Sequence, residues 1–146
     1  MRNFFAILIT FLIFSCDNKN TDRNPYLPEA GFNVEINLNL PLYSSLNIPG
    51  NSIYVGNLGA GIRGIFVTNT GSSFLAWEAS CPNHAPNDCS TMVITGGINC
   101  QCSCEAYTYS LFTGGLTGEE QPEGQTVYGL LNYRTTFNGD VVVVSN

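Results

Sequence analysis

Histidine and basic side chains are scarce in this chain. Its 146 residues include one histidine, His84, and five Lys or Arg against eleven Asp or Glu, for a net charge of −6. The scattered basic residues form no stripe, which argues against nucleic acid as a partner. A single imidazole also leaves no recognisable set of nucleophile, base and orienting group. We therefore predict no catalytic residue and expect a protein that is not an enzyme.

Long apolar runs are also missing. Residues 4–14 are apolar except for Thr10, and this run is shorter than the ~20 residues of a membrane-spanning helix. It fits the core of a signal peptide, and the Ser15-Cys16 that ends it resembles the bacterial lipobox, in which the signal is cleaved before a cysteine that is then lipidated. We therefore expect a lipoprotein signal peptide at residues 1–15 and lipidation of Cys16. The alternative is an ordinary secretory signal with an incidental cysteine.

The segment after Cys16 is polar and contains Pro25 and Pro28. This composition predicts a flexible tether at residues 16–30, followed by one domain at residues 31–146. Acyl chains on Cys16 would hold the protein in the bacterial cell envelope, facing the periplasm or the outer surface. The expected partners are the membrane, through lipidated Cys16, and an unknown envelope protein.

No segment combines helix caps with a 3.6-residue period. Phe32 to Leu40 instead alternates strictly between apolar and polar residues, which predicts a half-buried strand over the whole segment. Further β-prone runs, separated by turn residues, lie at 52–55, 64–69, 74–79, 91–95, 107–111, 127–133, 133–137 and 140–144. The predicted class is all-β, built from short antiparallel strands.

The C-terminal strands carry two more specific signals. Asn138-Gly139 lies between β-prone runs and predicts a tight hairpin turn in which both residues take positive φ. Val141 to Val144 shows no alternation, which predicts a strand covered on both faces.

The cysteines are few but clustered. Of six in the chain, five remain beside Cys16: Cys81, Cys89, Cys100, Cys102 and Cys104. In an exported protein such a cluster is interpreted first as disulfides, with four residues paired and one left over. Composition and spacing leave the pairing open.

The spacing of these residues resembles a known family. Cys81-Pro82-Asn83-His84, a gap over residues 85–101 and then Cys102-Ser103-Cys104-Glu105 are similar to the two cluster-binding loops of Rieske iron–sulfur domains. The family pattern is C-x-H, a gap of similar length and C-x-x-H, followed by Gly, an aromatic residue and Thr-Gly. Ala106, Tyr107 and Thr113-Gly114 follow here. The resemblance implies an all-β stack of antiparallel sheets with a small loop subdomain, at about residues 79–116, that carries the Cys motifs.

The resemblance also implies a cofactor. A [2Fe-2S] cluster would be held by Cys81, His84, Cys102 and Glu105, and the protein would transfer electrons, as a ferredoxin-like component of an oxidoreductase. Two departures weigh against it: His84 stands one position late, and Glu105 replaces the second histidine with a harder, anionic ligand. The N-terminal segment has one arginine, Arg2, and so lacks the twin-arginine signal that is typical of proteins exported with their cofactor. We therefore expect no cofactor and keep the cluster as the alternative.

Some Rieske domains tie their two loops together with a disulfide, and its second-loop cysteine lies where Cys104 stands. The resemblance thus implies the hypothesis of two bridges, Cys81–Cys102 and Cys89–Cys104, in place of the cluster. The sequence leaves the other two pairings of these four cysteines open. Cys100 would remain as a free thiol.

A zinc site is the third hypothesis for the same residues. Cys81, His84 and Cys102, with Cys104, are ligands of suitable softness for Zn²⁺, although one residue between two cysteines is tighter than the usual spacing.

The function we expect is an envelope-anchored, disulfide-stabilised binding module that contacts a partner through its loop tip.

Overall fold

The computed structural model describes residues 24–118, 124 and 126–146. The predicted signal peptide and Cys16 lie outside the described residues and stay predictions. Within the described part of the chain, no helix is long and apolar enough to cross a membrane.

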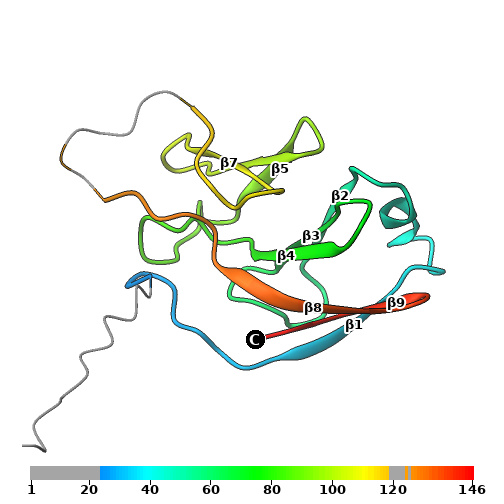
Figure 1. Cartoon of the computed structure of the whole chain (residues 1–146). Coiled ribbons are helices and arrows are strands. Elements are labelled where there is room, and N and C mark those ends of the chain that lie inside the picture. The colour runs from blue at the N-terminus through cyan, green and yellow to red at the C-terminus, as the bar shows by residue number, and fades with distance from the viewer. Residues whose placement is uncertain (1–23, 119–123, 125) are drawn as a thin grey trace, which may run out of the picture.

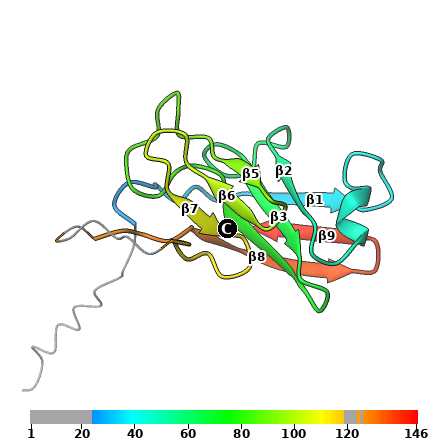
Figure 2. The same ribbon diagram turned by 90° about the horizontal axis from the view of Figure 1, so that it is seen from above.

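Two antiparallel sheets form the domain, as predicted. The larger has the strand order β1-β9-β8-β4-β3-β2 and the smaller the order β5-β6-β7. In Figure 1 the smaller sheet lies above β3 and β4, and Figure 2, seen from above, shows it in front of them. In chain order the elements are β1 Asn33–Asn37, the 3-10 helix η1 Ser44–Asn47, β2 Ser52–Val55, β3 Ile65–Asn69, β4 Phe74–Glu78, β5 Val93–Thr95, β6 Asn99–Gln101, β7 Thr108–Ser110, β8 Asn132–Asn138 and β9 Val141–Ser145.

Strand β3 is buried on both faces because it lies between two hydrophobic cores. Ile65 and Val67 face the core of the larger sheet, whereas Phe66 belongs to a second core that the smaller sheet covers. This second core also contains Cys81 and Cys102. The two cysteine loops are therefore anchored in the packed interior between the sheets.

Strand β1 is shorter than its alternation predicts. Ile36 and Leu38 are buried, as expected, but Leu40 is 49% exposed and the strand ends at Asn37. The side-chain oxygen of Asn37 accepts a hydrogen bond from the N–H of Asn39 at 2.9 Å, and its carbonyl accepts one from the N–H of Leu40 at 3.1 Å. These local bonds compete with the sheet ladder and turn the chain away.

The hairpin between β8 and β9 is present, but its turn differs from the prediction. Asn138 pairs with Val141, so the central residues of the turn are Gly139 and Asp140. Of Asn138, Gly139 and Asp140, only Gly139 has a positive φ, at 67°. The N–H of Asp140 donates to the carbonyl of Asn138 at 2.7 Å, so the turn closes around Gly139 as a γ-turn does. The prediction of positive φ at Asn138 is wrong.

Strand β9 also differs from its prediction. Val142 and Val144 are fully buried, whereas Val141 and Val143 are half-buried. The strand lies between β1 and β8 with one face on the core, and its other face is only partly covered. An unbroken valine run is therefore compatible with a strand that is buried on one side alone.

The sequence did not predict β6, and the strand that it predicted at 127–133 is wrong, whereas the run predicted at 133–137 is β8. β6 has a single apolar residue, Cys100, between Asn99 and Gln101, so it carries no alternation to detect. The predicted strand 127–133 is irregular until β8 begins at Asn132. Its backbone bonds elsewhere: the N–H of Tyr128 donates to the side chain of Asn83 at 2.7 Å.

Part of the predicted tether lies against the domain. Leu27 is 3% exposed, and the side-chain amide of Asn24 donates to the carbonyl of Pro82 at 2.7 Å. Tyr26 packs edge-to-face on Tyr128, with ring centroids 6.0 Å apart. The division of the chain at residue 30 stays a prediction, but Asn24 is hydrogen-bonded to the first cysteine loop and Leu27 is buried.

Candidate functional site

The first cysteine loop leaves β4 and is closed at its base. The N–H of Cys81 donates to the carbonyl of Ser90 at 2.8 Å, and the N–H of Met92 donates to that of Ala79 at 2.8 Å. Within the loop, the buried Asn83 donates from its amide to the hydroxyl of Tyr109 at 2.7 Å. These bonds fix the direction in which Cys81 and the residues after it project.

A buried carboxylate holds the strand end from which this loop starts. Glu78 is fully buried and accepts from the backbone N–H groups of Ile62, Arg63 and Ser80 at 2.7, 3.0 and 2.8 Å. The hydroxyl of Tyr133 donates to it at 2.6 Å. The backbone of the glycine-rich segment 59–64 is thus bonded to the protein's own Glu78 carboxylate.

The second cysteine loop connects β6 to β7. The N–H of Cys102 donates to the carbonyl of Tyr107 at 2.9 Å, and the N–H of Ala106 donates to that of Cys102 at 3.0 Å. Ala106 has a φ of 61°, a conformation that a residue with a Cβ adopts rarely. This is the position at which the Rieske pattern has glycine, so alanine here adopts a backbone conformation that glycine adopts more readily.

Two disulfides join the loops. Cys81 is bonded to Cys102 and Cys89 to Cys104, with Cα–Cα separations of 5.5 and 5.4 Å. These are the two pairings that the resemblance implied. The Cys81–Cys102 bond is fully buried, whereas Cys89 is exposed.

Cys100 is the free cysteine among the described residues. It is fully buried, and burial raises the pKa of its thiol to about 12. Its S–H group donates weakly to the sulfur of Met92 at 3.9 Å. Cys100 is therefore a packed apolar side chain rather than a reactive thiol.

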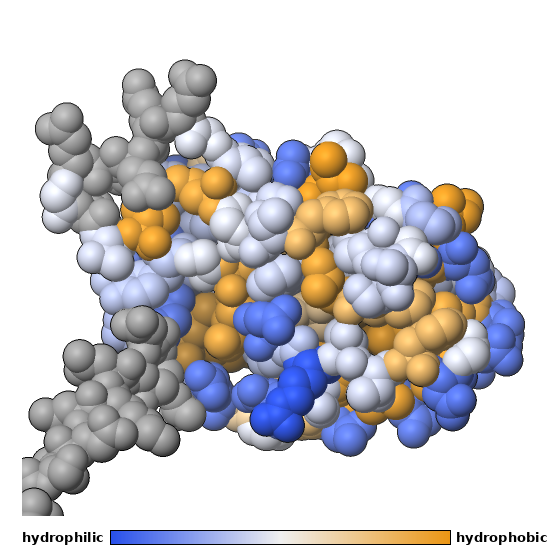
Figure 3. Space-filling model, viewed as in Figure 1, coloured by the Kyte–Doolittle hydropathy of each residue, from blue (hydrophilic) through white to orange (hydrophobic). Residues whose placement is uncertain are grey.

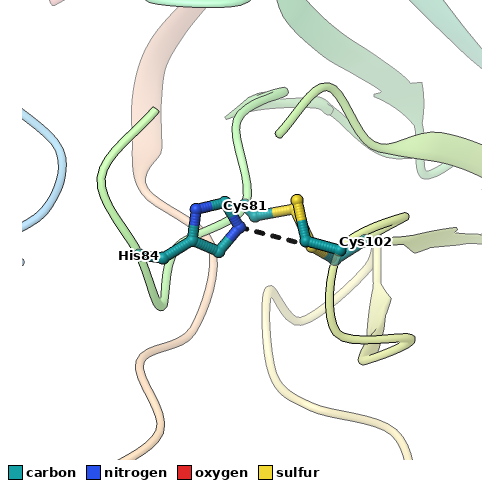
Figure 4. A group of neighbouring side chains, drawn as sticks. Cys81, His84 and Cys102 are labelled. Atoms are coloured by element: carbon teal, nitrogen blue, oxygen red, sulfur yellow. Dashed lines mark hydrogen bonds between the residues drawn. A yellow bond between two sulfur atoms is a disulfide. The ribbon is translucent and has the colours of Figure 1, made fainter. Parts of the chain in front are cut away.

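His84 points its ring at the buried disulfide (Figure 4). Its Nδ1 lies 2.9 Å from the carbonyl oxygen of Ala85. Because a carbonyl only accepts, Nδ1 carries the proton, and in the neutral ring Nε2 keeps a free lone pair. Nε2 lies 3.7 Å from Sγ of Cys102, and since a disulfide sulfur has no proton to give, this is a contact.

Glu105 lies at the edge of the same site. Its Oε2 is 3.9 Å from Sγ of Cys102, too far to be more than a contact. The ligand-type atoms of Cys81, His84, Cys102 and Cys104, in contrast, all lie within 4.8 Å of one another, and Glu105 is not in this group. The structure therefore brings together three of the residues predicted for a cluster and adds Cys104 to them.

Asn87 is a site residue that sequence reasoning missed. Its Oδ1 lies 3.0 Å from Sγ of Cys89 and 3.6 Å from Sγ of Cys104. Its carbonyl accepts a hydrogen bond from the guanidinium of Arg63 at 2.6 Å. An asparagine between proline and aspartate indicates only a turn, so no local signal could have assigned it to the exposed disulfide.

No protein-family model matches the sequence, and no curated protein matches it. Solved structures do match the fold. A quaternary ammonium Rieske monooxygenase aligns with a TM-score of 0.53 and 14% identity, over 84% of this chain and 34% of the other. The ferredoxin of carbazole 1,9a-dioxygenase from Nocardioides aromaticivorans IC177 aligns at 0.47 with 19% identity, over 80% and 97%. A complex of oxygenase and ferredoxin in carbazole 1,9a-dioxygenase aligns at 0.49 with 18% identity, over 77% and 92%.

The fold is Rieske-like. The chain spans about a third of the monooxygenase, and at these identities the likeness concerns the fold alone. One Rieske-like feature has a local explanation in this chain: Gly114 has a φ of 72°, and a Cβ there would lie 2.5 Å from the Trp77 ring. The Thr113-Gly114 turn is thus required by close packing on a core tryptophan.

The donor set of this site does not fit a [2Fe-2S] cluster. Such a centre needs two thiolates on one iron and two imidazoles on the other. Here Cys81 and Cys102 are bonded to each other and have no charge to offer, and His84 supplies the single imidazole of the chain. Glu105 would have to replace the second imidazole, although it lies outside the group of converging ligand atoms.

Proposed function

We propose that this protein is an envelope-anchored binding module whose Rieske-like domain is clasped by disulfides and carries no electron-transfer cluster. The observation that carries the proposal is the Cys81–Cys102 bond, which joins the two side chains that would hold one iron. It keeps the loops together as the metal would, and both cysteines pack in the core between the sheets. The ligand positions are thus converted to a structural role.

The loop tip is the surface we assign to the partner. Asp88 and Cys89 are exposed in the first loop and Ser103 in the second, while two disulfides and the buried Asn83 hold these loops in place. Loops that are already ordered lose little conformational entropy on binding. On the face shown in Figure 3, hydrophobic residues are interspersed with hydrophilic ones, so that view offers no single large apolar patch as a competing docking surface.

Photo-crosslinking in intact cells tests the binding role. A photoreactive amino acid in place of Asp88 should give a discrete protein adduct, because its side chain lies at the tip. The matched control is Thr136, which is also exposed but lies on β8 of the larger sheet. Adducts of the same size from both positions, or none from Asp88, would contradict a tip-directed partner.

The anchor is part of the same proposal. It is supported by the apolar segment 4–14 and the Ser15-Cys16 that ends it. Metabolic labelling with a fatty acid should mark the wild-type chain and not Cys16→Ser. Equal labelling of both proteins would remove the anchor from the account and leave the fold unaffected.

Electron transfer through an atypical [2Fe-2S] centre is the second candidate function. The observation that favours it is the convergence of Cys81, His84 and Cys102 at one place in a Rieske-like fold. It requires both cysteines to be unbonded thiolates. Disulfide bonding and iron ligation by these two residues exclude each other, which makes the two candidates separable by one analysis of the native protein.

A further inference from the structure

We propose that reduction of both disulfides converts this site into a mononuclear zinc site with Cys81, His84, Cys102 and Cys104 as ligands. The inference goes beyond the proposed binding role and does not depend on it. It differs from an iron–sulfur site in using Cys104 and in leaving Glu105 out.

The positions of the four ligand atoms are the first support. All lie within 4.8 Å of one another, and Nε2 of His84 is 3.7 Å from Sγ of Cys102. A tetrahedral Zn²⁺ with its usual bond lengths separates its ligand atoms by about 3.6–3.8 Å. Opening the Cys81–Cys102 bond lets the two sulfurs move apart to that spacing, so small side-chain adjustments suffice.

The second support is the orientation of His84. Its Nδ1–H is committed to the carbonyl of Ala85 at 2.9 Å, which leaves the Nε2 lone pair on the side of the sulfurs. A backbone carbonyl that accepts the other ring proton is the usual way in which a metal-binding histidine is held in its tautomer. The ligand atom is therefore already selected while the disulfides are intact.

The donor chemistry is the third support. Three thiolates and one imidazole form a closed, four-coordinate set that is typical of structural zinc. Cys81 and Cys102 are buried, while His84 and Cys104 are partly exposed, so the ion has a path to the site. Glu105 and Cys89 lie outside the converging group, although Cys89 is released as a thiol by the same reduction.

The chemistry balances as follows. Two equivalents of an external dithiol reduce the two disulfides to four thiols and are themselves oxidised to two disulfides. Zn²⁺ then displaces the protons of Cys81, Cys102 and Cys104 and accepts the Nε2 lone pair of His84, which releases three protons to solvent. Cys89 remains a thiol, and zinc takes over from the disulfides as the link between the loops.

The test is a metal titration of the full-length chain after phosphine reduction without oxygen. Co²⁺ should bind one per chain and give the intense thiolate-to-cobalt absorption of a tetrahedral site, and Zn²⁺ should displace it. Cys104→Ser and His84→Gln should weaken zinc binding by more than the ~10–100-fold that loss of an outer partner costs. Cys89→Ser and Glu105→Gln are the matched controls and should bind as the wild type does.

A second measurement separates metal binding from folding. In the reduced protein, Zn²⁺ should raise the thermal unfolding midpoint of Cys89→Ser but leave that of Cys104→Ser unchanged. The proposal is overturned if reduced wild type binds no metal in a defined ratio. It is equally overturned if Cys89→Ser loses affinity as much as Cys104→Ser, because the metal would then be held by thiols in general.

Discussion

Glu78 shows how a single buried charge can be made part of a fold. Its carboxylate accepts four hydrogen bonds, from the backbone of Ile62, Arg63 and Ser80 and from the hydroxyl of Tyr133. Each donor comes from outside β4, so the carboxylate connects three segments of the chain. A buried carboxylate whose hydrogen bonds are all made stabilises the folded state. If the carboxylate is removed, the buried N–H and O–H donors are left unpaired, and the fold is destabilised.

Glu78→Gln should therefore destabilise the protein by about 2–4 kcal/mol, since the neutral amide turns an NH₂ group toward backbone donors. Tyr133→Phe removes one donor and leaves the charge, so it should cost about 1 kcal/mol. Urea unfolding followed by fluorescence gives both free energies. Equal losses for the two variants would contradict the assigned role of the carboxylate.

Cys100 gives the protein a defined alkaline sensitivity. Burial raises the pKa of its thiol from 9.0 to about 12, so between these values the native chain keeps a proton that the unfolded chain has lost. The contribution of this thiol to the free energy of unfolding is fully present below pH 9. It is lost as the pH rises toward 12, by up to about 1.4 kcal/mol per pH unit. Burial also raises the pKa values of Tyr109 and Tyr133, and Cys100 is itself a minor cause of the rise at Tyr109.

The measurement compares the free energy of unfolding of wild type and Cys100→Ala at pH 8, 9 and 10. The wild type should lose stability over this range relative to the variant. Parallel curves would contradict the buried, protonated state of Cys100.

At the level of the loops, each of the two disulfides joins the first cysteine loop to the second, at a different depth. Cys81–Cys102 joins the bases of the two loops inside the second core, and Cys89–Cys104 joins their outer parts. A thiolate must reach a sulfur atom to reduce a disulfide. Cys89 is exposed and Cys104 is partly buried, whereas Cys81 and Cys102 are 0% exposed.

Limited reduction by dithiothreitol should accordingly open Cys89–Cys104 first. Timed alkylation and peptide mass spectrometry measure the order: Cys89 and Cys104 should be labelled while Cys81 and Cys102 remain bonded. Simultaneous labelling of all four would mean that reduction requires opening of the whole subdomain. Labelling of Cys81 and Cys102 first would contradict the arrangement outright.

At the scale of the whole molecule, sequence patterns predicted the class and most strands because burial imposes alternation. Phe32 to Leu40 contains the clearest case, and Ile36 and Leu38 are buried as it predicts. The pattern failed where local bonds compete, as at Asn37, and where a strand has one apolar residue, as in β6. It also misjudged Val141 and Val143, because a hydrophobic side chain can lie on a partly exposed face.

The site was predictable in outline through the resemblance, since the spacing of Cys81, Cys89, Cys102 and Cys104 indicated which loops meet. The residues that hold the two cysteine loops in place were not predictable. Asn83 donates to the carbonyl of Tyr128, and Oδ1 of Asn87 lies 3.6 Å from Sγ of Cys104. Both partners are remote in the chain and so leave no local signal. The same holds for residues 24–30, whose composition indicated a tether although Leu27 is buried.

Cys81 and Cys102, two of the residues predicted as cluster ligands, are bonded to each other. Disulfide mapping of protein purified from its own cell envelope, alkylated before unfolding and analysed together with its iron content, tests this directly. We expect peptides linked through Cys81–Cys102 and Cys89–Cys104, Cys100 alkylated only after unfolding, and no stoichiometric iron. Alkylated Cys81 and Cys102 in a protein with iron in a defined ratio and a visible absorption band would contradict this expectation.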